Sequence, residues 1–152
     1  MSKIKTYRGL LANNSIHEIN LRTNTGKIGY RITKFQIIGN APGTAEVEAI
    51  VQVFKSLPTA ASSLINFSDM DLLAAAEHRE FAAAEDMSSP QVIIFDREVF
   101  NQNIYVTYKA AAGTMSMNFY LELEQIKLND NESTMATLQS IRSRYETAAG
   151  PT

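Results

Sequence analysis

Apolar and polar residues alternate with a period of two in several segments of this chain, which is typical of β-strands. The clearest alternation lies in Ile104–Tyr108 and Phe119–Glu124, on either side of small residues that include Gly113. Glycine adopts the positive φ that short loops between strands often need, so this region is predicted to form a β-hairpin. Leu121 and Leu123 share one face of the second strand, and we expect both to be buried.

The same alternation predicts further strands, and the residues between them favour turns. Asn13-Asn14 tolerates the left-handed backbone region, and Pro42-Gly43 suits a type II turn. The predicted fold is therefore mainly β, an antiparallel β-sandwich or jelly-roll-like domain. The additional predicted strands are Lys5–Ala12, Ser15–Thr23, Gly29–Gly39, Glu46–Phe54 and Gln91–Phe95.

The segment Asp71–Glu85 does not follow this pattern clearly. It is rich in Ala, Leu, Glu and Arg, which have high helix propensity, and Ser68 or Asp69 could cap a helix at its start. The segment nevertheless lies between predicted strands, and alanine also fits in an edge strand. We predict a helix here, with an edge strand as the alternative.

A short helix is also predicted at the C-terminal end, over Asp130–Tyr145. Asn129 and Glu132 have the spacing of a capping box, in which each side chain binds the backbone of the other. We expect the helix to dock, either on the sheet or on a neighbouring chain, and its possible interface is an apolar stripe at helical spacing. The chain is thus predicted to comprise a β-sandwich domain, residues 1–128, and a helix with a tail, residues 129–152. The stripe is formed by Met135, Leu138, Ile141 and Tyr145.

Length and composition narrow the possible partners. A chain of 152 residues is long enough for one domain with a sizeable core, and 45% of its residues are hydrophobic. The formal net charge is −2, and Lys3, Lys5 and Arg8 form the only local basic cluster, so we expect no direct binding of nucleic acid. No apolar stretch approaches the roughly 20 residues of a membrane-spanning helix, and no secretory signal is recognised, so no membrane partner is expected.

Catalytic and metal-binding residues are not predicted anywhere in the chain, and no cofactor is expected. The chain has no cysteine, and its two histidines, His17 and His78, are isolated from one another, whereas a zinc site needs three or four ligands. Glu122 and Glu124 lie two apart on a strand, about 7 Å from each other by strand geometry. Such a pair could serve glycoside hydrolysis, but charged residues on the outer face of a strand are far more common.

A binding role for aromatic residues is the alternative functional interpretation. Tyr105, Tyr108 and Tyr120 lie in the two most regular predicted strands. If their rings were exposed on one face beside the glutamate pairs, the chain would be a jelly-roll carbohydrate-binding module. Packing of aromatic residues within the core and across strands is the commoner arrangement in sheets. Solvent exposure of the three rings would therefore distinguish these two interpretations.

The C-terminal third of the chain resembles small structural proteins of marine tailed bacteriophages. Three segments carry the resemblance: DREVFNQNIYVTY at Asp96–Tyr108, NFYLELE at Asn118–Glu124 and NESTMATLQSIR at Asn131–Arg142. The resemblance implies a non-enzymatic virion component with a β-sandwich fold, either a capsid decoration protein or a minor head protein. It further implies other virion subunits as partners, including copies of this chain in a homo-oligomer. The implied location is the virion, assembled in the host cytoplasm.

Overall fold

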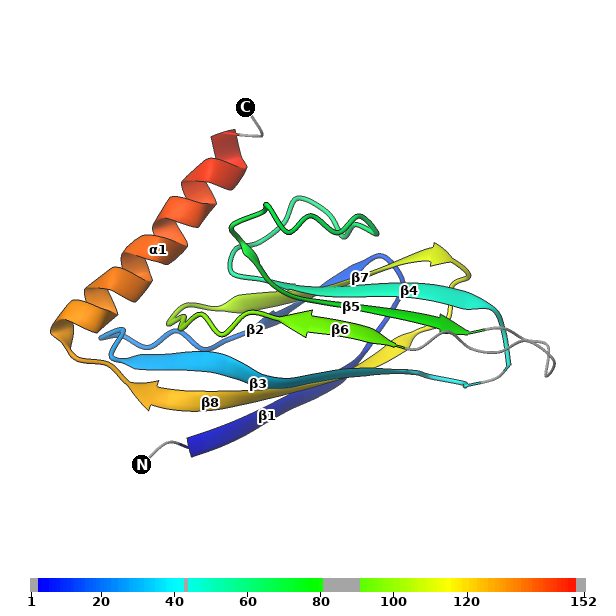
Figure 1. Cartoon of the computed structure of the whole chain (residues 1–152), viewed down its shortest axis with the longest axis horizontal. Coiled ribbons are helices and arrows are strands. Elements are labelled where there is room, and N and C mark those ends of the chain that lie inside the picture. The colour runs from blue at the N-terminus through cyan, green and yellow to red at the C-terminus, as the bar shows by residue number, and fades with distance from the viewer. Residues whose placement is uncertain (1–2, 43, 81–90, 150–152) are drawn as a thin grey trace.

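The computed structural model describes residues 3–42, 44–80 and 91–149, with side chains described as far as residue 141. Over these residues the chain is mainly β, with two antiparallel sheets that pack face to face and one C-terminal helix (Figure 1). The predicted antiparallel β-sandwich with a C-terminal helix is therefore confirmed.

The smaller sheet has three strands in the order β1-β8-β3. β8 is the central strand of this sheet, and it pairs with β1 on one side and with β3 on the other. A β-bulge between Ile32 and Lys34 shifts the pairing of β3 with β8. The strands are β1 (Lys3–Leu11), β3 (Ile28–Gly39) and β8 (Met117–Lys127).

The larger sheet has five strands in the order β2-β7-β4-β5-β6. β4 lies at the centre of this sheet and pairs with both β5 and β7. β2 is shorter than predicted and ends at Ile19. Beyond it, the amides of Leu21 and Arg22 donate hydrogen bonds to the Asn103 side-chain oxygen and not to a neighbouring strand. The strands are β2 (Ser15–Ile19), β4 (Val47–Phe54), β5 (Leu72–Glu80), β6 (Val92–Phe95) and β7 (Ile104–Ala112).

The core lies between the two sheets and is made by alternate residues of their strands. Leu121 and Leu123 of β8 are fully buried, as the alternation predicts. They face a larger sheet whose β4 contributes the buried residues Val47, Ala49, Val51 and Val53. Burying one aliphatic side chain of this size stabilises a fold by about 1.5–3 kcal/mol, so this shared apolar layer holds the sheets together.

The helix predicted over Asp71–Glu85 is wrong for the part that the structure describes. Residues 72–80 form β5, which pairs with β4 on one side and β6 on the other, and residues 81–85 lie outside the described residues. Leu73, Ala74 and Ala76 of β5 pack in the core. Backbone pairing with two neighbours and burial of small side chains thus outweigh the helix propensity of alanine, which is a weak local preference.

The hairpin predicted around Gly113 is also wrong, although both strands exist. β7 belongs to the five-stranded sheet and β8 to the three-stranded sheet, so the connection between them crosses from one layer to the other. Gly113 has a φ of +77°, and a β-carbon there would lie 2.2 Å from the carbonyl oxygen of Glu46. Gly113 is therefore needed for this crossing, where the chain passes close to the start of β4.

Candidate docking surfaces

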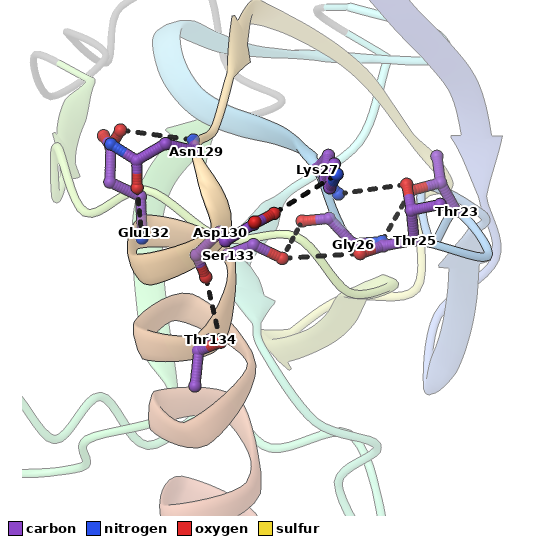
Figure 2. Close-up of polar contacts among 9 residues, drawn as sticks. All are labelled: Thr23, Thr25, Gly26, Lys27, Asn129, Asp130, Glu132, Ser133 and Thr134. Carbon is purple, nitrogen blue, oxygen red and sulfur yellow. Dashed lines mark hydrogen bonds and ion pairs between the residues drawn. The ribbon is translucent and has the colours of Figure 1, made fainter.

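The C-terminal helix, α1 (Asp130–Ala149), begins with the predicted capping box (Figure 2). The Asn129 side-chain oxygen accepts a hydrogen bond of 2.8 Å from the amide of Glu132. The Glu132 carboxylate in turn accepts one of 3.3 Å from the amide of Asn129. Asp130 adds an acidic side chain at the first turn and lies 3.2 Å from the Lys27 ammonium. The capping box and the helix dipole together fix where α1 starts and in which direction it leaves β8.

Gly26 is the point on the sandwich to which α1 is attached. Its carbonyl oxygen accepts hydrogen bonds from the Ser133 hydroxyl at 2.8 Å and from the Asn101 amide at 3.0 Å. The Asn101 amide also donates to the Thr137 hydroxyl at 2.9 Å. Gly26 has a φ of +66°, and a β-carbon on it would lie 3.1 Å from both Asn101 and Ser133. Only glycine fits easily here, because the helix approaches the backbone so closely.

The side of α1 that faces the sandwich carries small, mostly polar residues. Ser133, Ala136 and Ser140 are buried, and Thr137 is partly buried between them. Their spacing of three and four residues places them on one face of the helix. Small side chains let the helix come close, while the Ser133 hydroxyl donates to the Gly26 carbonyl oxygen and the Thr137 hydroxyl accepts from the Asn101 amide. Hydrogen bonding and close approach therefore hold α1 in place, with little apolar burial.

The apolar stripe of α1 points away from the sandwich, contrary to the possibility that it covers the chain's own sheet. Met135, Leu138 and Ile141 are 59%, 55% and 40% exposed, respectively. The side chain of Tyr145, the fourth predicted member, lies outside the described residues. Met135 also lines one side of a groove of about 420 Å³ beside the end of β8, which Ile126 and Leu128 line as well. We call the surface formed by Met135, Leu138 and Ile141 the helix stripe.

A second exposed apolar surface lies on the loop between β4 and β5, residues 57–70, which we call the apolar loop. Figure 1 shows it on the side of the five-stranded sheet that faces away from β1, β3 and β8. Leu64 is the most exposed of its large hydrophobic residues, at 81%. Large apolar side chains gathered on a surface commonly mark an interaction site. The exposed members are Leu57, Leu64, Ile65, Phe67 and Met70.

The apolar loop is nevertheless fixed to the sheet beneath it. The amide of the buried Gln52 donates hydrogen bonds of 3.1 Å to the carbonyl oxygens of Ser62 and Leu64. At the start of the loop the buried Lys55 ammonium lies 2.9 Å from the Glu98 carboxylate, and at its end the Ser56 hydroxyl binds the Asp71 carboxylate. The exposed apolar residues are thus held on an ordered framework.

The apolar loop was not identified as a surface from the sequence. The segment from Pro58 onward reads as a loop because of its proline and small residues, and Gln52 reads as an outward-facing strand residue. The available signal was the occurrence of Leu64, Ile65 and Phe67 among turn-forming Ser and Asn residues, where apolar side chains have no strand or helix face to join. This signal indicates exposed apolar residues but does not say on which sheet the loop lies.

The three tyrosines of the carbohydrate-binding alternative do not meet on one face. Tyr108 is fully buried in the core, and its hydroxyl donates a hydrogen bond to the carbonyl oxygen of Met115. Burial raises the pKa of Tyr108 to about 12. Tyr105 and Tyr120 are partly exposed, but they belong to different sheets. Tyr105 lines a small polar pocket with Arg22, on the five-stranded sheet.

The acidic pair Glu122 and Glu124 lies on the outer face of the three-stranded sheet, and each carboxylate has its own neighbour. The Thr33 hydroxyl donates to Glu122 at 3.1 Å, and the Arg31 guanidinium lies 2.9 Å from Glu124. These contacts are those expected of charged residues that decorate a strand. The pair is therefore accounted for by local hydrogen bonds and an ion pair.

The two histidines lie apart and in different surroundings. His17 of β2 is exposed, with its ring centroid 5.7 Å from that of Phe119. His78 of β5 is partly buried, 3.1 Å from the Gln91 amide and 3.5 Å from the Glu80 carboxylate. Among the described residues, no group of three or more His, Cys, Asp or Glu side chains is arranged to hold a metal ion.

Comparison with known proteins adds no further assignment. No protein-family model, curated protein or solved structure gives a significant match to this chain. Within the described part of the chain, α1 is too polar to cross a membrane. The surfaces described above are therefore the observations from which a function has to be inferred.

Proposed function

We propose that this chain is a non-enzymatic structural subunit of a virion, which works by docking on neighbouring protein subunits. The observation that carries the proposal is the orientation of α1, whose polar side is attached to the sandwich while Met135, Leu138 and Ile141 are exposed. An isolated helix is marginally stable in water, and covering an apolar stripe is the usual way in which a helix is stabilised. A neighbouring subunit is the occupant that fits this stripe.

The apolar loop supports the same proposal, because it supplies a second surface on a different element. Leu64 and Phe67 on this loop are more exposed than the residues of the helix stripe. A subunit that binds through two different patches can be linked to more than one neighbour, as in rings and shells built from head-to-tail contacts. The expected partners are therefore other virion subunits, including copies of the same chain.

The virion is proposed because of the resemblance of Asp96–Tyr108, Asn118–Glu124 and Asn131–Arg142 to structural proteins of marine tailed phages. A decoration or minor head protein fits better than a genome-lining shell protein. A protein that lines the genome needs a basic face or arm, whereas this chain has a net charge of −2. On this proposal the protein is assembled into particles in the host cytoplasm.

The test exchanges the helix stripe for polar residues of similar size. In the triple variant Met135→Gln, Leu138→Gln and Ile141→Gln, incorporation into particles should fall by about tenfold or more, since each buried apolar contact contributes about 1 kcal/mol or more to binding. Incorporation is measured by quantitative mass spectrometry of purified particles. A matched control, Thr134→Gln with Gln139→Asn, changes exposed polar residues of the same helix.

The control variant should incorporate normally, and both variants should keep the circular dichroism spectrum of the parent. If the triple variant folds and incorporates as well as the parent, the helix stripe is not the docking surface. If incorporation instead fails on changing Leu64→Gln and Phe67→Gln alone, docking takes place through the apolar loop. If none of these variants affects incorporation, the proposal that the chain docks through its exposed apolar residues is wrong.

A further inference from the structure

The outer face of the three-stranded sheet carries a groove of about 490 Å³ that lies over β8. The strand register places Leu10, Asn118 and Ile38 in one row across the sheet, and Arg8, Tyr120 and Gln36 in the next. These six residues face outward, away from the core. The groove is therefore built by regular strands, which hold its side chains in fixed relative positions.

The walls of the groove at its first row are aliphatic. Leu10 on β1 and Ile38 on β3 are 55% and 61% exposed, and the polar Asn118 lies between them on β8. An exposed aliphatic residue on both sides of a polar floor suits a ligand that has both apolar edges and hydrogen-bonding groups.

The second row combines an aromatic ring with polar side chains that are not engaged. The Tyr120 ring is partly exposed. The side chains of Arg8, Gln36 and Asn118 make no hydrogen bond or ion pair with any other described residue. They thus offer a guanidinium and two amides to a ligand, beside one ring face.

Among the described residues that line the groove, Arg8 is the one that carries a charge. The Arg8 guanidinium has no carboxylate partner among the described residues, and the Lys34 ammonium lies 5.8 Å from the centre of the Tyr120 ring. Glu122, the nearest acidic residue along β8, is the register partner of Lys34, so its negative charge lies beside that cation. A ligand in the groove would therefore meet the Arg8 guanidinium, and an anionic group on it would gain a charge-assisted hydrogen bond there.

We propose that this groove binds an acidic saccharide, a sugar chain that carries carboxylate or sulfate groups. The apolar face of a sugar ring would stack on Tyr120, while its hydroxyls would pair with the Gln36 and Asn118 amides. The anionic group would be held by Arg8, whose planar guanidinium matches a carboxylate or sulfate with two parallel hydrogen bonds. Leu10 and Ile38 would contact the edges of the neighbouring sugar units.

This site is separate from the proposed docking surfaces. The apolar loop belongs to the other sheet, and α1 begins beyond Lys127, at the opposite end of β8 from Asn118. Only Tyr120 is shared with the earlier grouping of three tyrosines, of which Tyr108 is buried. Saccharide binding and docking can therefore be lost independently, so the two proposals have separate tests.

The test is isothermal titration of the purified full chain with two acidic probes, a galacturonic acid hexasaccharide and a heparin hexasaccharide. Maltohexaose is the neutral control. We expect at least one acidic probe to bind with a Kd of about 1 mM or tighter, and the affinity to weaken as salt is raised. Maltohexaose should bind at least about tenfold more weakly, because it lacks the group that pairs with Arg8.

Variants at the groove locate the binding site. Tyr120→Ala and Arg8→Gln should each weaken binding of the acidic probe about tenfold or more, whereas Tyr120→Phe should retain most of it because the ring remains. Thr6→Ala, a change on the same face outside the groove, should leave binding unchanged. All four variants should keep the thermal midpoint of the parent within a few degrees, which separates lost binding from lost folding.

Three outcomes would overturn the proposal. The first is that neither acidic probe binds at concentrations up to about 10 mM. The second is that maltohexaose binds equally well, and the third is that Tyr120→Ala and Arg8→Gln have no effect. If the acidic probes fail to bind while Leu10→Gln with Ile38→Gln changes the oligomeric state, the groove is a contact between protein subunits instead.

Discussion

The β-sandwich and the C-terminal helix are held by opposite kinds of contact. Between the sheets, apolar residues such as Leu121 and Val51 are completely buried. Between α1 and the sandwich, the contacts come from Ser133, Thr137 and Asn101, and the apolar residues of the helix face outward. A helix held in this way keeps its apolar surface free for another molecule. We propose on this basis that the sandwich serves as the scaffold and that α1 is displayed by it.

The largest expected effect comes from breaking the sandwich itself. Leu121→Ala should lower the free energy of unfolding by about 2–5 kcal/mol, because it removes a fully buried side chain and leaves a cavity. Urea denaturation followed by fluorescence measures this loss. Thr6→Ala, on the exposed face of the neighbouring strand, is the control and should change stability by less than about 0.5 kcal/mol. If Leu121→Ala lowered the stability as little as the control does, the core would be assigned to the wrong face of β8.

A second effect on the sandwich depends on pH. The pKa of Tyr108 is raised to about 12 by burial, so the folded chain keeps this proton at a pH where the unfolded chain, with a pKa near 10, has lost it. The stability from this group is complete below about pH 10 and is lost as pH rises toward 12, by roughly 2–3 kcal/mol.

Denaturation at pH 9, 10 and 11 compares the parent with Tyr108→Phe. The variant should start less stable, because it lacks the hydrogen bond to Met115, and its stability should fall less steeply above about pH 10. Tyr7 and Tyr30 also have raised pKa values because of burial, so a smaller fall should remain in the variant. Parallel curves for the two proteins would contradict the burial of Tyr108.

Detaching the helix should have a smaller effect, confined to α1. Asn101→Ala removes an amide that bridges Gly26 and Thr137, and it should cost about 1–3 kcal/mol. Hydrogen exchange should then become faster in the amides of α1, while those of β4 and β8 keep their protection. Thr6→Ala, on the exposed face of β1 and far from α1, is the control. Uniform loss of protection across the sandwich would show that Asn101 supports the whole fold and not the helix attachment alone.

The smallest effect on stability is expected at the helix stripe. The triple variant Met135→Gln, Leu138→Gln and Ile141→Gln should unfold within about 0.5 kcal/mol of the parent in the isolated chain, because these side chains are already exposed. The same measurement on Ala136→Gln, which crowds the buried side of α1, should show a clear loss. If the stripe variant were the less stable of the two, the orientation of α1 would have to be reversed.

The sequence predicted the strands and the capped helix because these depend on local patterns. The alternation in Phe119–Glu124 and the spacing of Asn129 and Glu132 both fix a structure without distant contacts. Sheet membership depends on distant contacts instead. Nothing in the pattern around Gly113 reveals that β7 and β8 lie in different layers, and β5 is a strand only because β4 and β6 pair with it.

The orientation of α1 could not be predicted because its apolar stripe is the stronger sequence signal. An apolar stripe on a helix is usually buried, so the pattern places the small residues Ser133, Ala136 and Ser140 on the outer side. Their burial depends on Gly26, which is distant in sequence and lets the helix approach closely. The candidate saccharide groove was hidden for a similar reason, since Arg8, Gln36 and Tyr120 meet only through strand register.

Methionine oxidation tests the central claim, that the helix stripe is free in the isolated chain and covered in the assembly. Met135 is 59% exposed and Met117 is fully buried, so the two provide a site and an internal control within one protein. Brief treatment with hydrogen peroxide, read by mass spectrometry, should oxidise Met135 much faster than Met117 in the free chain. In purified particles, Met135 should become protected to the level of Met117. Equal oxidation of Met135 in free chain and particle would contradict docking through α1.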